Sequence, residues 1–209
     1  KIYKRYPLER NSILLAPKDE DNFWLVTLKG LSSVNINTGK KSLYELPPKC
    51  VDINDVLTAK NGDLYIATAD EGLFVKRANS TNGPDDFEQF TYANSSLTTN
   101  NILSVIEDND NSIILTTDRG ITKFYPYAGT FANWQQWNGM MPHAFYKKSK
   151  LLTSDNRIFF GTYDGVIEIP DKIEPPRTTE SNIIFSRLYI GGKPKSPSLD
   201  FDSLNLGFN

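Results

Sequence analysis

Short apolar segments alternate with polar turns along the chain, and one arrangement of the two occurs four times. In each copy an apolar run ends at a threonine, and a glycine followed by an aliphatic residue comes three or four positions later. The copies are residues 23–27 before Gly30, 64–68 before Gly72, 113–117 before Gly120, and 158–162 before Gly165. The glycines are 42, 48 and 45 residues apart. A recurring unit of about 40–50 residues that is rich in short strands is typical of a β-propeller.

The third copy shows what one repeat predicts. Residues 101–107 alternate apolar and polar side chains after the first positions, as expected of a half-buried strand. Asp and Asn residues fill positions 108–111 and predict a tight turn, because their side chains bond to their own backbone. The run 113–117 is too short for a helix and apolar on both sides, which predicts a strand buried on both faces. Residues 121–125 and 131–137 complete a four-stranded unit.

Side-chain size along the central strands follows one rule in all four copies. The residue before the final threonine is small or of modest size: Val26, Ala67, Thr116 and Gly161. Two positions earlier, on the same face of the strand, stands a larger residue: Trp24, Tyr65, Ile114 and Phe159. This taper fits wedge-shaped blades that converge on an axis.

These patterns predict an all-β fold, because no segment has a helical period. We expect a partial β-propeller of about four blades, each a four-stranded antiparallel sheet. Its central strands are predicted at residues 22–27, 63–68, 112–117 and 157–162.

The two ends of the chain differ from the repeat and set the expected domain boundaries. Residues 1–6 read as the outer strand of a preceding blade, and the absence of an initial methionine favours a piece of a longer protein. Pro175 and Pro176 mark a stiff boundary, and residues 182–190 then read as a strand of another module. We predict propeller blades over residues 1–174, and a Pro-rich linker with the first strands of a second module over residues 175–209.

Composition narrows the possible partners. The net charge of −2 and a pI near 5.5 leave no basic surface, so no nucleic-acid partner is expected. No apolar run approaches the roughly 18 residues that a membrane-spanning helix needs. Cys50 is the only cysteine, which excludes an internal disulfide and a cysteine-based metal cluster. No histidine or basic cluster stands near it in sequence, so we predict a packed, inert thiol.

Several segments resemble a known family. Residues 101–108 and 115–121 resemble the two-component-regulator propeller repeat, whose pattern is roughly N-x-I-x-S-I-x-E-D followed by W-I-G-T-x-x-G-L. Residues 159–166 resemble the last blade of that family, and residues 175–193 are similar to the entry into the Ig-like Y_Y_Y module that follows it. This order is typical of hybrid two-component sensors of gut Bacteroidetes, Bacteroides among them. The chain departs from the pattern in that the family's tryptophan survives only as Trp24.

The resemblance implies a function that composition and spacing do not show. It implies the periplasmic ectodomain of an inner-membrane hybrid sensor, which binds oligosaccharides or other glycan-derived small ligands and signals to a histidine kinase. On this interpretation the chain is not itself an enzyme and needs no cofactor. It meets the membrane only through the parent protein, which would be a homodimer. Two alternatives stay open: a propeller lyase or hydrolase acting on polysaccharide, and a purely structural interaction module.

Candidate catalytic chemistry is sparse. His143 is the only histidine, and no partner that could orient it for catalysis is recognisable in the sequence. One histidine and one cysteine are too few for a histidine-based metal site. Residues 108–111 lack the glycine and the distant glutamate of a calcium-binding EF-hand loop. We therefore predict no catalytic residue and no metal site.

One group of aromatic and polar residues is the candidate ligand site. Trp134, Trp137, His143 and Tyr146 are close in sequence, and Arg119 lies in a turn expected on the same rim of the propeller. Aromatic rings can lie flat on the apolar face of a sugar, while His and Arg side chains bond its hydroxyls. The competing interpretation is that both tryptophans pack between blades. Truncating them would then lower stability instead of ligand affinity.

Overall fold

The fold was analysed in a computed structural model of the 209-residue chain. The structure describes residues 12–80, 83–134, 144–170, 188–190 and 193–195. The chain divides into two compact units, residues 1–176 and residues 177–209. The predicted strand over residues 1–6 lies outside the described residues.

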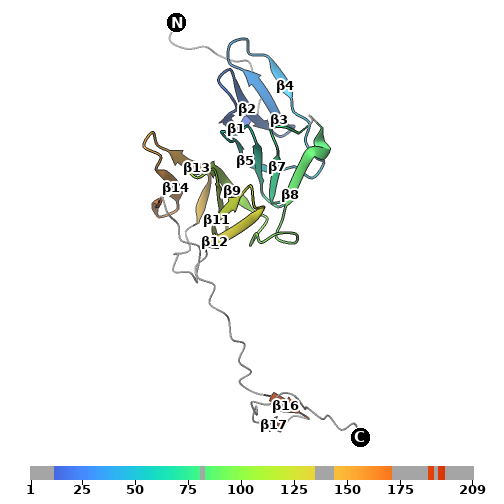
Figure 1. The fold of residues 1–209 in the computed structure, drawn as a ribbon, viewed down its shortest axis with the longest axis vertical. Helices are drawn as coiled ribbons and strands as arrows, with labels where there is room; N and C mark the ends of the chain where they lie inside the picture. Colours follow the sequence, from blue (N-terminus) through green and yellow to red (C-terminus); the bar gives the residue numbers. More distant parts are fainter. Residues whose placement is uncertain (1–11, 81–82, 135–143, 171–187, 191–192, 196–209) are drawn as a thin grey trace. The chain divides into compact units, whose positions relative to one another are not determined.

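The described residues of the first unit form four antiparallel sheets that follow one another along the chain, and we call them blades 1 to 4 (Figure 1). Blade 1 consists of β1 (Ser12–Pro17), β2 (Asn22–Thr27), β3 (Gly30–Asn35) and β4 (Lys41–Leu43). Blade 2 consists of β5 (Ile53–Thr58), β6 (Leu64–Thr68), β7 (Leu73–Lys76) and β8 (Phe87–Phe90), with the 3₁₀ turn η1 (Pro84–Asp86) before β8.

Blades 3 and 4 follow the same plan. Blade 3 consists of β9 (Ile102–Glu107), β10 (Ile113–Thr117), β11 (Gly120–Tyr125) and β12 (Thr130–Trp134). Blade 4 has three described strands, β13 (Phe145–Leu152), β14 (Ile158–Thr162) and β15 (Gly165–Ile169).

Within each blade the strands are named A to D in chain order. The A strands β1, β5, β9 and β13 contact one another from blade to blade, so they line the axis of the arrangement. The predicted all-β propeller of four blades is therefore confirmed, and each predicted central strand is the B strand of its blade. The described segments contain no helix with the length and hydropathy that a membrane span requires.

The repeated threonine and glycine build the turn between strands B and C. The Thr117 hydroxyl donates to the Gly120 carbonyl oxygen at 3.1 Å and accepts from the Arg119 N–H at 3.1 Å. Thr68 donates in the same way to Gly72, over 2.8 Å. Gly72 has φ of +77°, and a Cβ there would lie 2.1 Å from the Phe90 carbonyl oxygen. A larger residue would therefore be strained and would also clash with the backbone.

The turns between strands A and B also share one geometry. In blade 3 the Asn111 N–H donates to the Asp108 carbonyl at 3.2 Å, and in blade 4 the Asn156 N–H donates to the Thr153 carbonyl at 3.0 Å. Asn111 and Asn156 have φ of 61° and 66°, a region that Asn tolerates better than most residues. The turn predicted at residues 108–111 is confirmed.

Apolar side chains fill the spaces between successive blades. Trp24 of blade 1 packs in a cluster with Val56 and Ile66 of blade 2, and its indole N–H donates to the Thr58 hydroxyl at 2.8 Å. Tyr65 of blade 2 belongs to the next cluster, with residues of blade 3. The third cluster joins blades 3 and 4, and it includes Ile114, Ile158 and Phe160. The large residues of the predicted taper thus fill the contacts between blades in the first three copies.

The second unit contains one described sheet. Strands β16 (Leu188–Ile190) and β17 (Lys193–Lys195) pair antiparallel. The assignment of this unit to an Ig-like Y_Y_Y module, and the boundary after residue 174, stay predictions.

Candidate functional site

One rim of the propeller collects the B–C turns and the connections between blades. The Ala69 N–H in the B–C turn of blade 2 donates to the Asp52 carbonyl at 3.1 Å, just before strand β5. The Gly72 N–H donates to the Asn100 carbonyl at 3.0 Å, in the connection that leads to blade 3. In blade 4 the Tyr163 N–H donates to the Ala144 carbonyl at 3.0 Å. We call this end of the blades the B–C rim.

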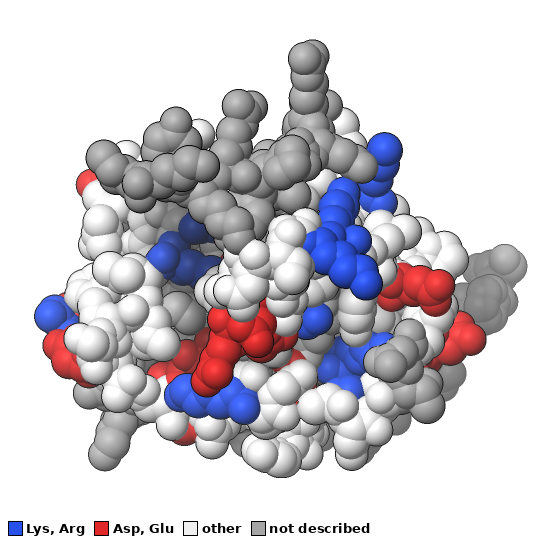
Figure 2. All heavy atoms as spheres, turned by 90° about the horizontal axis from the view of Figure 1, so that it is seen from above, with Lys and Arg blue, Asp and Glu red and all other residues white. Residues whose placement is uncertain are grey.

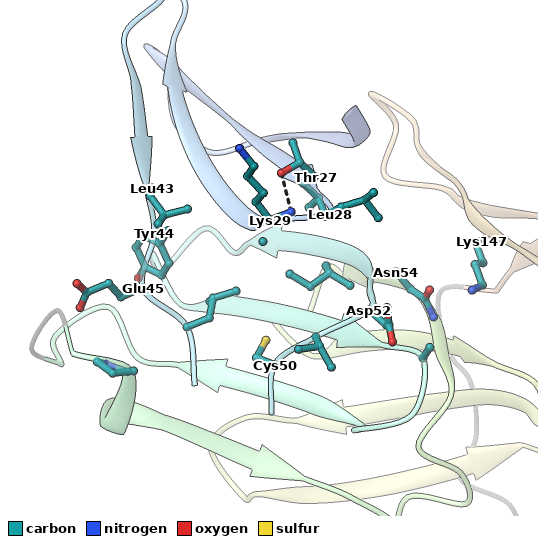
Figure 3. A pocket seen from close by; sticks show the side chains of 17 residues that line it. Thr27, Leu28, Lys29, Leu43, Tyr44, Glu45, Cys50, Asp52, Asn54 and Lys147 are labelled. Atoms are coloured by element: carbon teal, nitrogen blue, oxygen red, sulfur yellow. Dashed lines mark hydrogen bonds between the residues drawn. The ribbon is translucent and has the colours of Figure 1, made fainter. Parts of the chain in front are cut away.

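A pocket of about 730 Å³ opens at the B–C rim between blades 1 and 2 (Figure 3). Its lining comes from the B–C turn of blade 1, from the connection between the two blades, and from the start of β5. Leu28, Leu46, Val51 and Ile53 supply apolar surface. The volume and the mostly apolar lining with a few polar groups are typical of a site for a small molecule.

Three polar side chains lie at one end of this pocket, where Figure 3 shows Asp52, Asn54 and Lys147 on the same side. Thr27, Lys29, Tyr44 and Glu45 line other parts of it. Asn54 is 4% exposed, and its amide nitrogen donates to the Ile102 carbonyl oxygen of blade 3 at 2.8 Å. That bond fixes the orientation of the amide group. The end of the pocket nearest blade 3 therefore has a positioned amide, a carboxylate and an ammonium group.

Lys147 reaches the pocket from blade 4, because strand β13 is more irregular than the other A strands. In blade 2, Ile53 and Asp55 face Thr68 and Ala67, so one extra residue bulges out of the A strand. In blade 4, Phe145 and Lys150 face Thr162 and Phe160, which leaves three extra residues on β13. Residues 146–149 form this wide bulge. Its Lys148 has φ of 63°, which is uncommon for a residue other than glycine and marks a strained backbone.

A buried ion pair fixes β13 directly after the bulge. The Lys150 ammonium group binds the carboxylate of Asp55, which is fully buried on β5, and donates to the Val105 carbonyl oxygen at 2.6 Å. The same Asp55 carboxylate accepts the Val105 N–H at 2.9 Å. Three A strands, from blades 2, 3 and 4, therefore meet at one carboxylate. This contact holds the bulge, and with it Lys147, in place near the axis.

Cys50 belongs to the wall of the same pocket but is 5% exposed. Burial raises the pKa of its thiol to about 12. The reactive species is the thiolate, so the thiol is unreactive at neutral pH. The structure therefore agrees with the predicted inert, packed thiol.

We expect Cys50 to resist a thiol reagent such as DTNB in the native protein at pH 8. The reason is that both the low thiolate fraction and the burial slow the attack. Labelling should become rapid in 6 M guanidinium chloride, which measures the same thiol in the unfolded chain. Native labelling at the unfolded rate would contradict the burial and the raised pKa.

The structure places three of the five predicted ligand-site residues, all at the B–C rim. Trp134 ends β12, opposite Ile121, and is 7% exposed. Arg119 stands in the B–C turn of blade 3 and is exposed. Tyr146 lies in the wide bulge, 46% exposed, with its ring centroid 4.6 Å from that of Tyr163. None of the three lines the pocket between blades 1 and 2.

Trp137 and His143 lie outside the described residues. The competing interpretation has both tryptophans packed between blades, and the burial of Trp134 is compatible with it. Its role in ligand binding stays a prediction.

No sequence motif marks the pocket residues Asn54 and Lys147. A sequence feature that could have indicated Lys147 lies in β13, an inner strand with lysines at positions 147, 148 and 150. Such a run breaks the alternation of a half-buried strand and indicates a special role. Asn54 stands at the single extra residue of β5, a place where bulges commonly redirect a side chain.

The face of the molecule shown in Figure 2 has charges of both signs. On the face shown in Figure 2, Lys and Arg side chains lie interspersed with Asp and Glu side chains. Among the described residues, no three His, Cys, Asp or Glu side chains are grouped so that they could hold a metal ion.

The fold class is that of a β-propeller, and solved structures share it. The chain superposes on the extracellular domains assigned to the hybrid two-component systems BT3049 and BT4673 of B. thetaiotaomicron. For BT3049 the TM-score is 0.56 at 21% identity, over 73% of this chain and 20% of that one. For BT4673 it is 0.53 at 19% identity, over 71% and 19%. Virginiamycin B lyase from Staphylococcus aureus, an enzyme, also superposes, with a TM-score of 0.51 at 18% identity, over 78% and 55%.

These likenesses establish the fold and not the function, because all three identities are low. The chain spans about one fifth of the length of the two extracellular domains. No protein-family model matches the sequence, and no curated protein matches it.

Proposed function

We propose that this chain is part of the ligand-sensing region of an extracellular sensor domain in a hybrid two-component system. Its ligand would be a small glycan fragment, bound at the B–C rim. The parent protein would be a homodimer in the inner membrane, with the propeller in the periplasm and a kinase on the other side. The chain would supply recognition and no catalysis.

The observation that carries this proposal is the pocket between blades 1 and 2. It has the volume of a small-molecule site and presents a fixed amide beside a carboxylate and an ammonium group. A sugar offers hydroxyl groups that such side chains can bind, and carbon–hydrogen faces that fit apolar walls. The shared fold with two extracellular sensor domains supports the same interpretation.

The pocket also explains how a ligand could change the protein. Its lining comes from blades 1 and 2 and from Lys147 of blade 4, so a bound molecule contacts separate blades and favours one relative arrangement of them. A ligand can shift an equilibrium between two arrangements only by its difference in affinity for them. A site between blades provides such a difference directly.

We expect glycan binding to stop when the pocket is filled. Val51 is 53% exposed and lines the pocket, so Val51→Trp should occupy the space without disturbing the core. Binding is measured by NMR titration of the ¹⁵N-labelled chain with oligosaccharides of two to six sugars, one at a time. A ligand should shift the amide signals of residues 27–30 and 50–54 in the original chain and leave those of the variant unchanged.

Leu15→Trp is the matched control, because Leu15 is 61% exposed on β1 and does not line the pocket. This variant should bind like the original chain. Saturable binding that survives Val51→Trp would place the site elsewhere, with Trp134, Trp137, His143, Tyr146 and Arg119 as the next candidates. Release of shorter sugars during the titration would favour the enzyme alternative. Binding of no oligosaccharide would contradict the proposal.

A further inference from the structure

Among the residues that the structure describes, Lys147 is the one charged group that enters the pocket from outside blades 1 and 2. It lies on an exposed stretch of the wide bulge of β13. No carboxylate of the described residues lies within 4.0 Å of its ammonium nitrogen, whereas Lys150 three positions later binds Asp55. The ammonium group of Lys147 thus lies at the pocket wall, and it forms no ion pair with a described side chain.

The inner strands concentrate positive charge around this position. Strand β13 has three lysines, at positions 147, 148 and 150, and the neighbouring wall of β5 has the single carboxylate of Asp55. That carboxylate is already bound by Lys150 and by the Val105 N–H. The bulge itself, residues 146–149, contains two lysines and no carboxylate.

Lys29 and two carboxylates also line the pocket and must be weighed against Lys147. In Figure 3 the Lys29 side chain points away from the end where Asp52, Asn54 and Lys147 lie. The Glu45 carboxylate points away from the pocket interior in Figure 3. Asp52 stands beside Asn54, at the same end of the pocket as Lys147. As an acceptor Asp52 suits hydroxyl groups of a ligand, whereas an ammonium group is the natural partner of an anion.

We infer that the pocket binds a hydroxylated small molecule with one anionic group, and that Lys147 holds this group at the end of the pocket nearest the axis. This inference rests on the proposed function and names the chemical class of its ligand. The carboxylate of a sugar acid, a sulfate and a phosphate share the required chemistry. The strained backbone at Lys148 and the anchor at Lys150 are the structural features that keep Lys147 there.

The test compares four sugars that differ only at carbon 6: galactose, galacturonate, galactose 6-sulfate and galactose 6-phosphate. Each is titrated into the ¹⁵N-labelled full chain at low ionic strength, and the dissociation constant is read from the amide signals of residues 50–54. At least one anionic sugar should bind about tenfold more tightly than galactose, because a charge-assisted hydrogen bond replaces a neutral one. The best of the three identifies the anionic group.

Lys147→Gln should remove this preference. The dissociation constant of the anionic sugar should then lie within about twofold of that of galactose. Lys60→Gln is the matched control, because Lys60 is exposed in the A–B turn of blade 2, at the opposite rim. That variant should keep the full preference. Raising the salt concentration should weaken the binding of the anionic sugar and leave the binding of galactose unchanged.

Two results would overturn the inference. One is equal affinity for all four sugars in the original chain, including the case in which none of them binds. The other is a preference for the anionic sugar that Lys147→Gln leaves intact. Oligosaccharide binding that Val51→Trp abolishes would in either case leave the proposed function standing, so the two failures are distinguishable.

Discussion

Asp55→Ala should destabilise the propeller more than any change in its surface charges, by about 3 kcal/mol. The side chain of Asp55 is fully buried, whereas that of Lys150 is 22% exposed. Removing the carboxylate leaves the Val105 N–H without its acceptor and the ammonium group without its counter-ion. Water can reach part of Lys150, so the loss should lie at the lower end of the range for a broken buried pair. The free energy of unfolding is measured by urea denaturation.

The exposed pair Arg157–Glu168 is the natural comparison. Its nitrogen and oxygen atoms are 2.7 Å apart, with side chains 50% and 45% exposed. Glu168→Ala should therefore change the urea midpoint only slightly, because exposed pairs contribute little. The double variant Asp55→Ala with Lys150→Met should recover part of the loss, since the unpaired charge is then gone. Similar midpoints for Asp55→Ala and Glu168→Ala would contradict the bridging role.

The repeat was predictable from sequence because its causes are local. Thr117 and Gly120 stand three positions apart, and their hydrogen bond closes the turn between adjacent strands. The same is true of the A–B turn at Asn111, where residue type selects the backbone angle. The size taper was also predictable, because the same position of strand B meets the following blade in the first three copies, at Trp24, Tyr65 and Ile114.

The pocket was not predictable, because it depends on residues far apart in the chain. Lys147 lies in blade 4, yet it lines a pocket between blades 1 and 2. Its position follows from three extra residues in the register of β13, which no local pattern announces. The pairing of Lys150 with Asp55 spans 95 positions and likewise appears only after folding.

Trp134 is a residue that the sequence suggested as part of a site but that the fold buries. Sequence proximity placed it in a cluster of aromatic and polar residues, which suggested a sugar-binding surface. In the folded blade it is 7% exposed at the end of β12. An aromatic residue near a rim can face the solvent or the neighbouring strands, and only the packing decides which.

Phe124→Ala should be the most damaging change in the core, with a loss of about 3–5 kcal/mol in the free energy of unfolding. Phe124 is fully buried, and its ring centroid lies 4.6 Å from that of Phe131 and 5.0 Å from that of Phe90. Tyr65 of blade 2 meets the same ring at 6.3 Å. Truncation therefore opens a cavity between blades 2 and 3 and removes several aromatic contacts at once.

Tyr127→Ala is the matched control, because Tyr127 is 90% exposed in the turn that follows β11. This substitution should lower the free energy of unfolding by at most about 0.5 kcal/mol. The reactivity of Cys50 adds a second readout, since that thiol lies between blades 1 and 2. If the blades unfold as one unit, Phe124→Ala should lower the urea concentration at which Cys50 becomes reactive as much as it lowers the circular dichroism midpoint. Repeat proteins can instead lose neighbouring units separately. An unchanged Cys50 midpoint would then show that the pocket stays folded without the contact between blades 2 and 3.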